Sequence, residues 1–309
     1  MKKRQSIIFG IAAVCLLSTE IFLRQYYGFC DTVLMIEDAD YEYMAQPSQD
    51  RFRFRNRIKY NSESMRSPEV DTTAGIILGF GDSVINGGVL TDHDSLATTI
   101  LSDTLSKIQG KKVQFLNISA GSWGPDNCFA YLKKHGDFGA ESIFLFVSSQ
   151  DAFDTMDFKK IVDVDPSFPS RQYSLAFYEL LDRYAMPRIE RLLKKQSTNT
   201  KYIELIKKED RGILNTGFES FLTYARSKDI PLTIYLHADR EELKAGNYNQ
   251  QGQAIIKFAN EKDIRIIMDL DNNLELNDFR DEIHINSRGQ KKLATTLIDN
   301  WNDEISVQK

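Results

Sequence analysis

The sequence predicts an α/β protein in which helices cover both faces of a parallel five-stranded sheet, with one apolar helix ahead of it at the N-terminus. Two patterns carry this prediction. From residue 74 onward, short apolar runs alternate with helical segments, which is typical of parallel βαβ units. Residues 7–23 form an apolar run whose only charge is Glu20. The 309 residues are 42% hydrophobic and 27% charged, which excludes a disordered chain.

Five apolar runs predict the strands of the sheet. They are Ala74–Phe80, Val113–Ser119, Ser142–Val147, Pro231–Leu236 and Ile264–Met268. Helical patterns lie between and after them, at Leu96–Lys107, Asp126–Lys134, Phe218–Lys228, Gln250–Glu261 and Ser287–Trp301. Residues 154–228 are longer than one crossover needs, so we expect a helical insertion that could cap the site. It contains a helix at Ser174–Lys195, which Pro187 is expected to kink or divide.

Residues 1–24 predict a membrane anchor. Three basic residues at positions 2–4 precede the run Ile7–Leu23, whose 17 residues are at the short end of the range for a spanning helix. A cleaved signal peptide is the alternative, but it needs small residues at its cleavage site, and bulky Ile21 and Phe22 follow Glu20. We therefore expect a single-pass anchor through residues 7–23, with the rest of the chain outside the cytoplasm because the basic flank is N-terminal.

Residues 25–73 read as a polar connecting region with a basic strand, and residues 74–309 as the α/β domain. In the connecting region, basic residues alternate with mostly apolar ones from Arg51 to Tyr60. A period of two predicts one strand with a basic, solvated face. The alternative is a basic strip that meets lipid head groups or an anionic glycan. The three cysteines exclude a disulfide scaffold, and Cys30 and Cys128 are expected as free thiols rather than as a bridge.

Polar residues and glycines follow three of the predicted strands. Gly81-Asp82-Ser83 comes after the first, Gly121 after the second and Ser148–Asp151 after the third. The carboxyl ends of parallel strands meet at one edge of the sheet, where such folds bind substrate. Near the C-terminus, Asp281 stands three residues before His284, where it can accept the imidazole N–H and fix the tautomer.

These residues resemble the SGNH (GDSL-type) hydrolase family, over about residues 76–294. The resemblance implies a three-layer α/β/α sandwich with a flavodoxin-like sheet. It also implies that Ser83 is the nucleophile, His284 the base and Asp281 its orienting carboxylate. Gly121 matches the block that gives a backbone N–H to the oxyanion hole, beside the N–H of Ser83 itself.

The third block departs from the family pattern G-x-N-D. Ser148 replaces the glycine, and Gln150 replaces the asparagine whose amide donates to the oxyanion. Glutamine can donate the same hydrogen bond, but it is one methylene longer. We expect Gln150 to complete the oxyanion hole, with a hole made by Ser83 and Gly121 alone as the alternative.

Other polar residues receive more ordinary interpretations. We expect His93 at the surface and His135 in a structural contact at a helix end. His237 ends the fourth strand and is a candidate substrate contact, as is Trp123, for which core packing is the alternative. The spacing of Asp151, Asp154 and Asp157 is read as a solvated helix start rather than a cation site, so no metal and no cofactor are expected.

Two functions from different classes follow. The first is a membrane-anchored serine esterase outside the cytoplasm that removes or transfers acyl groups, most simply acetyl, on a surface glycan. The second is a non-catalytic SGNH-like accessory module that binds glycan or scaffolds a membrane acyltransferase. The formal net charge of −5 disfavours a nucleic-acid partner.

Overall fold

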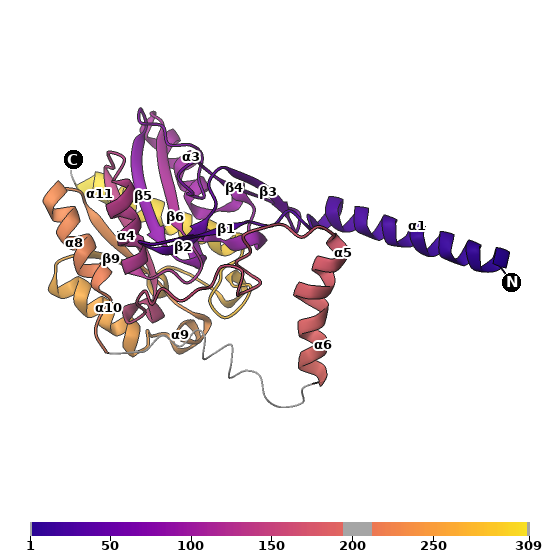
Figure 1. The fold of residues 1–309 in the computed structure, drawn as a ribbon. Coiled ribbons are helices and arrows are strands. Elements are labelled where there is room, and N and C mark those ends of the chain that lie inside the picture. Colours follow the sequence, from indigo (N-terminus) through magenta and orange to yellow (C-terminus); the bar gives the residue numbers. More distant parts are fainter. Residues whose placement is uncertain (1, 194–211, 308–309) are drawn as a thin grey trace.

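A five-stranded parallel sheet stands at the centre of the computed structural model, which describes residues 2–193 and 212–307 (Figure 1). Its strands are β5 (Gly75–Gly81), β6 (Val113–Ser119), β7 (Ser142–Ser148), β8 (Leu232–His237) and β9 (Arg265–Met268). Their spatial order is β6-β5-β7-β8-β9, which is the flavodoxin-like order 2-1-3-4-5. The predicted sheet is therefore confirmed, with each strand within two residues of its expected bounds.

Helices cover both faces of this sheet. One face carries α3 (Ala97–Gln109) and α11 (Ser287–Val307), and their Leu101 and Leu293 share a core with Phe115 of β6. The other face carries α4 (Pro125–His135), α8 (Thr216–Lys228) and α10 (Gln250–Glu261). The short helices α2 (Ser83–Asn86) and α9 (Arg240–Ala245) follow β5 and β8. Every residue of β5, β6 and β7 is buried, which explains why these strands read as continuous apolar runs.

Two hairpins precede the sheet. The first pairs β1 (Met35–Asp38) with β2 (Glu42–Ala45), and the second pairs β3 (Gln49–Arg53) with β4 (Asn56–Tyr60). Their apolar side chains enter the main core, where Met44 and Ile58 are at most 1% exposed. The connecting region thus packs closely on the α/β domain, and its division from that domain at residue 74 stays a prediction.

The prediction of a single basic strand from Arg51 to Tyr60 was wrong, because these residues form the β3–β4 hairpin. Phe54 and Arg55 both have positive φ, 49° and 68°, so the chain reverses in two residues and the pattern folds back on itself. Cross-strand partners share a face, and the pairs are Arg51 with Ile58 and Phe52 with Arg57. The basic residues therefore divide between the two faces, and Arg53 is buried at 1% exposure.

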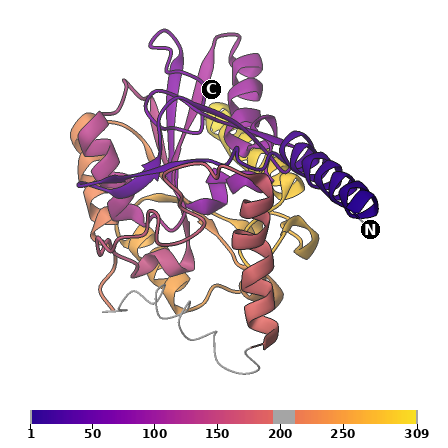
Figure 2. The ribbon, with the colours of Figure 1, turned by 45° about the vertical axis from the view of Figure 1, so that its right-hand side comes forward.

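The N-terminal helix α1 (Lys2–Tyr27) projects from the rest of the molecule (Figures 1 and 2). Among the described residues, one helix is long and apolar enough to cross a membrane, at Arg4–Tyr27, a test that a signal sequence also passes. The membrane anchor therefore stays a prediction. At its C-terminal end α1 joins the fold, because Leu23 packs with Phe29 and with Ala176 of the insertion.

The described helix of the insertion is continuous, and whether the insertion caps the site stays a prediction. The helix runs as α5 (Ala176–Glu179), a π-helical stretch (Leu180–Ala185) and α6 (Met186–Leu193). Pro187 lies where the wider π-helix returns to α-helical geometry, and the helix does not break there. Its N-terminal end packs on α1, and Phe168, in the loop before it, approaches Gly121. The remaining part of the expected helix and residues up to 211 lie outside the described residues.

Candidate active site

Ser83 lies at the carboxyl edge of the sheet, directly after β5. The side chain of Asp82 caps α2 by accepting a hydrogen bond from the N–H of Val84 at 2.8 Å, so Ser83 is the first residue of that helix. Gly81 sits against β7, where a Cβ would come within 3.0 Å of the carbonyl oxygen of Phe146. The glycine therefore permits the strand to run close to its neighbour before the turn to Ser83.

His284 connects Ser83 with Asp281. Its Nε2 lies 2.9 Å from Ser83 Oγ, and its Nδ1 lies 2.9 Å from both carboxylate oxygens of Asp281. Because a carboxylate only accepts, Nδ1 carries the proton and Nε2 is free to accept from the Ser83 hydroxyl. This is the arrangement in which a serine can become a nucleophile.

Asp281 is held in the ionised form. Although partial burial raises its pKa, hydrogen bonds from the backbone and ring of His284 outweigh that effect and lower the pKa below its ordinary value. The backbone N–H groups of His284 and Ile283 donate to the same carboxylate oxygen at 2.8 and 3.1 Å. The carboxylate therefore fixes both the ring and the backbone of the base.

Strand register places the expected oxyanion donors at the same edge as Ser83. Gly81 pairs with Ser119, so Ser83 and Gly121 each stand two residues past paired positions. The carbonyl of Gly121 accepts a hydrogen bond from the Tyr43 hydroxyl at 2.7 Å, which orients this turn. Gln150 lies in the 3-10 turn Ser149–Ala152 after β7, with an exposed side chain. The oxyanion roles of Ser83, Gly121 and Gln150 stay predictions.

The sequence reasoning missed Arg66, which supports the loop after the nucleophile. Arg66 is fully buried, and its guanidinium donates to the carbonyl oxygens of Asn86, Gly88 and Thr91. Burial lowers its pKa to about 10. Gln290 of α11 also reaches this loop, where it donates to the carbonyl of Val84 at 2.8 Å. Both contacts join distant parts of the chain, so no local pattern indicates them.

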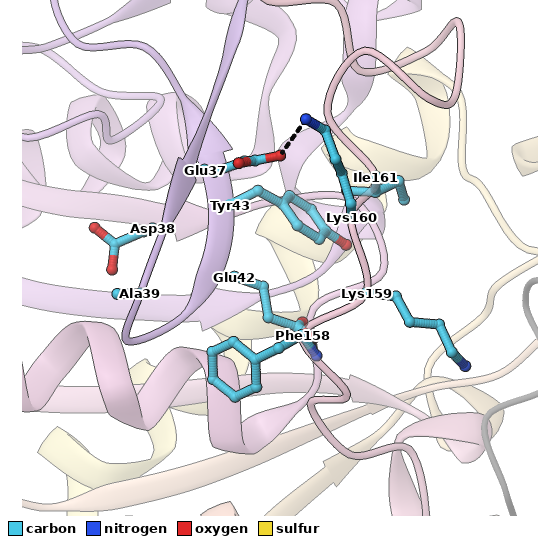
Figure 3. Close-up of a pocket in the computed structure, with 9 residues that line it drawn as sticks. All are labelled: Glu37, Asp38, Ala39, Glu42, Tyr43, Phe158, Lys159, Lys160 and Ile161. Carbon is cyan, nitrogen blue, oxygen red and sulfur yellow. Dashed lines mark hydrogen bonds and ion pairs between the residues drawn. The ribbon is translucent and has the colours of Figure 1, made fainter.

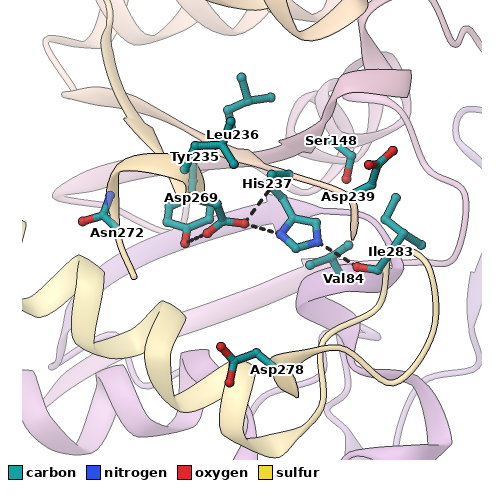
Figure 4. Close-up of polar contacts among 12 residues, drawn as sticks. Val84, Ser148, Tyr235, Leu236, His237, Asp239, Asp269, Asn272, Asp278 and Ile283 are labelled. Carbon is teal, nitrogen blue, oxygen red and sulfur yellow. Dashed lines mark hydrogen bonds and ion pairs between the residues drawn. The ribbon is translucent and has the colours of Figure 1, made fainter. Parts of the chain in front are cut away.

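His237, a candidate substrate contact, is buried and held by protein groups on both ring nitrogens. The ring is 2% exposed; its Nε2 lies 2.7 Å from the carbonyl oxygen of Ile283, and its Nδ1 contacts the carboxylate of Asp269 (Figure 4). The same carboxylate accepts from the hydroxyl of Tyr235. Both ring nitrogens face acceptors, so His237 links the end of β8 to Ile283, the residue before His284.

Trp123, the other candidate substrate contact, is buried at 1% exposure. Its Nε1 donates to the carbonyl of Tyr43 at 2.8 Å, and its ring packs against Tyr41 and Tyr131. The core packing that was the alternative is therefore what the structure has. The reason is the β1–β2 hairpin, which covers this part of the sheet.

The remaining histidines differ from each other. His93 is buried at 5% exposure rather than at the surface, because the turn His93–Ser95 packs against β4 and α3. Burial lowers its pKa. His135 has the structural role expected of it, since its ring stacks on Tyr131 and its Nδ1 lies 3.0 Å from Glu63.

The expected absence of a metal site concerns Asp151, Asp154 and Asp157. Asp151 is buried rather than solvated, because it caps the turn after β7 by accepting from the N–H of Ser148 at 2.7 Å. Within the described residues, no group of three metal-ligating side chains comes together. Cys30 and Cys128 are both free thiols.

A cavity of about 370 Å³ lies between the β1–β2 hairpin and residues 158–161 (Figure 3). Charged side chains of both signs line it, including Glu37 and Lys160, whose ends lie 3.7 Å apart. Tyr43 also lines it, and the same tyrosine donates to the carbonyl of Gly121. The cavity thus shares one wall residue with the candidate active site.

Comparisons with protein-family models and with curated proteins found no match. Among solved structures, the chain is similar to a member of the lipolytic protein G-D-S-L family from Veillonella parvula, with 15% identity and a TM-score of 0.39, over 73% of this chain and 97% of that one. It is also similar to AlinE4, an SGNH-hydrolase family esterase, with 14% identity and a TM-score of 0.39, over 75% of this chain and 96% of that one. A third is a carbohydrate acetylesterase family member from Sinorhizobium meliloti, with 12% identity and a TM-score of 0.36, over 72% of this chain and 95% of that one. By their names, these three are a G-D-S-L lipolytic protein, an SGNH-hydrolase family esterase and a carbohydrate acetylesterase family member.

Proposed function

We propose that this chain is a membrane-anchored serine esterase of the SGNH (GDSL) type, which acts outside the cytoplasm on acyl groups, most simply acetyl, carried by a surface glycan. The observation that carries the proposal is the hydrogen-bonded series Ser83–His284–Asp281, in which both links are 2.9 Å long. It lies at the carboxyl edge of a parallel sheet, where such folds bind substrate.

The proposed reaction follows from the proton on His284 Nδ1, which leaves Nε2 free to accept the proton of Ser83. Ser83 Oγ attacks the ester carbonyl carbon while His284 Nε2 takes its proton, and Asp281 stabilises the resulting imidazolium. Backbone N–H groups of Ser83 and Gly121, with the amide of Gln150, stabilise the oxyanion. The departing alkoxide takes the proton from His284 and leaves acyl-Ser83. Water or a sugar hydroxyl then attacks this acyl group, with His284 as the base again.

The openness of the site supports a bulky acyl carrier. Ser83 is only half-buried, and the side chains of His284 and Asp281 are 28% and 50% exposed. An acetyl group on a polymer reaches such a site without the polymer entering a closed cavity. The basic N-terminal flank of α1 supports the position outside the cytoplasm.

A serine-reactive fluorophosphonate probe on the full chain tests the proposal. We expect labelling of the folded protein, loss of labelling in Ser83→Ala, and unchanged labelling in Ser220→Ala, which removes an exposed hydroxyl from α8. Folded protein that is not labelled would contradict the esterase and favour the accessory module. Release of acetate from an O-acetylated polysaccharide, compared with transfer to an added oligosaccharide, then separates hydrolase from transferase.

A further inference from the structure

The helical segment Ala176–Leu193, formed by α5, the π-helical stretch and α6, has an apolar face that the rest of the chain leaves open. Its described exposed apolar side chains are Phe177, Tyr178, Leu181, Met186 and Ile189, which are between 39% and 57% exposed. Ala176 and Glu179, by contrast, are fully buried against α1 and the β3–β4 hairpin. The helix therefore packs on the protein through α5 and the π-helical stretch, whereas Met186–Ile189 at the start of α6 are all exposed, and its large apolar groups stay uncovered.

This helix starts at a fixed level along α1. The carboxylate of Glu20 accepts hydrogen bonds from the N–H groups of Ala176 and Phe177 at 2.8 and 2.9 Å. Glu20 lies three residues before the end of the apolar run at Leu23, or about 4.5 Å along the helix axis. The first turn of α5 is therefore level with the edge of the apolar run, and its N–H groups stabilise the one charge within that run, which also pairs with Arg24.

The helix also runs crosswise to α1. In both views α6 leaves the end of α1 in a different direction from α1 itself, and it descends beside the domain (Figures 1 and 2). A helix that starts at the edge of a spanning segment and runs across it lies in the plane of the interface. Glu179 in its first turn contacts Arg53 of the hairpin, so the exposed side of this turn, with Phe177 and Tyr178, faces away from that contact.

A buried ion pair holds this arrangement. Arg53 of β3 donates to Glu179 at 2.6 Å, and the two side chains are 1% and 0% exposed. The guanidinium also lies 4.5 Å from the ring centroid of Phe29 and 4.7 Å from that of Phe54. A charge pair enclosed in this way fixes the position of α5 relative to the hairpin. The height of α5 along α1 is therefore set by the fold.

Aromatic residues mark the same level on α1. Tyr26 and Tyr27 are 43% and 37% exposed, and Phe22 stacks on Tyr26 with ring centroids 5.2 Å apart. The guanidinium of Arg55, at the tip of the hairpin, lies 5.3 Å from the ring of Tyr26. Exposed tyrosines with a neighbouring cation are typical of the boundary between acyl chains and head groups.

We propose that the outward face of Ala176–Leu193 lies in the surface of the bilayer that α1 crosses, as a second, interfacial membrane contact. The proposal rests on the membrane anchor of the proposed function but not on its esterase activity. Phe177, Leu181 and Ile189 would insert at the boundary of the acyl chains, where burial of each side chain is favourable.

Tryptophan quenching in the full chain tests this contact. The chain is reconstituted in phosphatidylcholine–phosphatidylglycerol vesicles with brominated acyl chains, and fluorescence is corrected for Trp123 and Trp301 with the unmodified protein. We expect Leu181→Trp to lose about half of its added fluorescence, as for an interfacial side chain. Ile108→Trp is the matched control, because Ile108 is an equally exposed apolar residue on α3. It should not be quenched. Tyr178→Trp repeats the measurement should Leu181→Trp fail to fold.

A third variant separates failure of the contact from failure of the anchor. Phe9 on α1 is 75% exposed, and Phe9→Trp reports whether α1 enters the bilayer. Quenching at position 9 without quenching at positions 181 and 178 would overturn the interfacial contact and leave the anchor intact. No quenching at any of the three would refute the anchor and the contact together. A dimer in the vesicles with position 181 unquenched would show that a second copy covers this face, which also overturns the proposal.

Discussion

The buried pair of His237 and Asp269 predicts a stability that depends on pH and that one substitution removes. Ring Nε2 donates to the carbonyl of Ile283, and Nδ1 donates to Asp269, whose carboxylate also accepts from Tyr235. Although burial alone lowers the pKa of His237, the carboxylate and the carbonyl raise it above its ordinary value of 6.5. The imidazolium is therefore the form that the fold stabilises.

The size of the effect follows from what His237→Leu leaves behind. It leaves the carboxylate of Asp269 buried with the Tyr235 hydroxyl and one backbone N–H at 3.2 Å. Breaking a buried pair in this way costs about 3–5 kcal/mol. The carbonyl of Ile283 also loses its partner, but this residue is only half-buried, so water can replace the hydrogen bond. We expect a total loss of about 3–5 kcal/mol in the free energy of unfolding.

Urea unfolding of the detergent-solubilised chain, followed from pH 5 to pH 9, measures this loss. A pKa raised in the fold gives a stability that is complete below pH 6.5 and is lost as pH rises through the folded value. The unmodified protein should therefore lose stability toward alkaline pH, and His237→Leu should lose this dependence together with the 3–5 kcal/mol. The double variant His237→Leu, Asp269→Asn removes the buried carboxylate that has lost its partner, and it should recover part of the lost stability. An unchanged unfolding midpoint in His237→Leu, or an unchanged pH dependence, would refute the reasoning.

Three further predictions concern the candidate active site and the hairpin. Ser83→Ala and His284→Ala should each abolish hydrolysis of a small acetyl ester, and the double variant should be no worse than either, because the two side chains act as a unit; additive losses in kcat would contradict the assignment. Gln150→Ala should lower kcat by about 10²–10³-fold with little change in KM, as for other side-chain oxyanion donors, and Gln150→Asn should retain activity; an unchanged kcat in folded Gln150→Ala, checked by circular dichroism, would leave a hole of two backbone donors. Arg53→Met should destabilise the protein by about 3 kcal/mol, the low end for a buried pair, because Arg183 still contacts Glu179 at 3.1 Å. Thermal unfolding measures that loss. The double variant Arg53→Met, Glu179→Leu should recover much of it, because it also removes the buried, unpaired carboxylate. An equal loss in the double variant would show that the unpaired charge is not the cause.

The sheet and the contacts among Ser83, His284 and Asp281 could be predicted because their signals are local. Strands buried on both faces leave runs such as VQFLNIS, and the expected and observed bounds of β6 agree. Asp281 and His284 are three residues apart, so one loop brings them together. The carboxyl ends of parallel strands meet at one edge, which places Ser83 within reach of that loop.

The supporting contacts could not be predicted because they join distant parts of the chain. Arg66 binds the carbonyl oxygens of the nucleophile loop about 20 residues away, and the partner of Arg53 is 126 residues away. The turn at Phe54 and Arg55 uses positive φ without glycine or asparagine, so its sequence carries no turn signal. A histidine at a strand end gives the same local pattern whether it meets substrate or, as His237 does, a buried carboxylate.

The contact of Glu20 with the start of α5 also sets a time order during synthesis. The two N–H groups that Glu20 accepts from are made 156 and 157 residues after it. At roughly 5–20 residues per second, they follow roughly 10–30 s after Glu20 leaves the ribosome. In the folded protein Glu20 also accepts a hydrogen bond from Arg24, four residues away, at 2.6 Å. The junction between α1 and the domain therefore closes only after more than half of the chain, including the first three strands of the sheet, has been made.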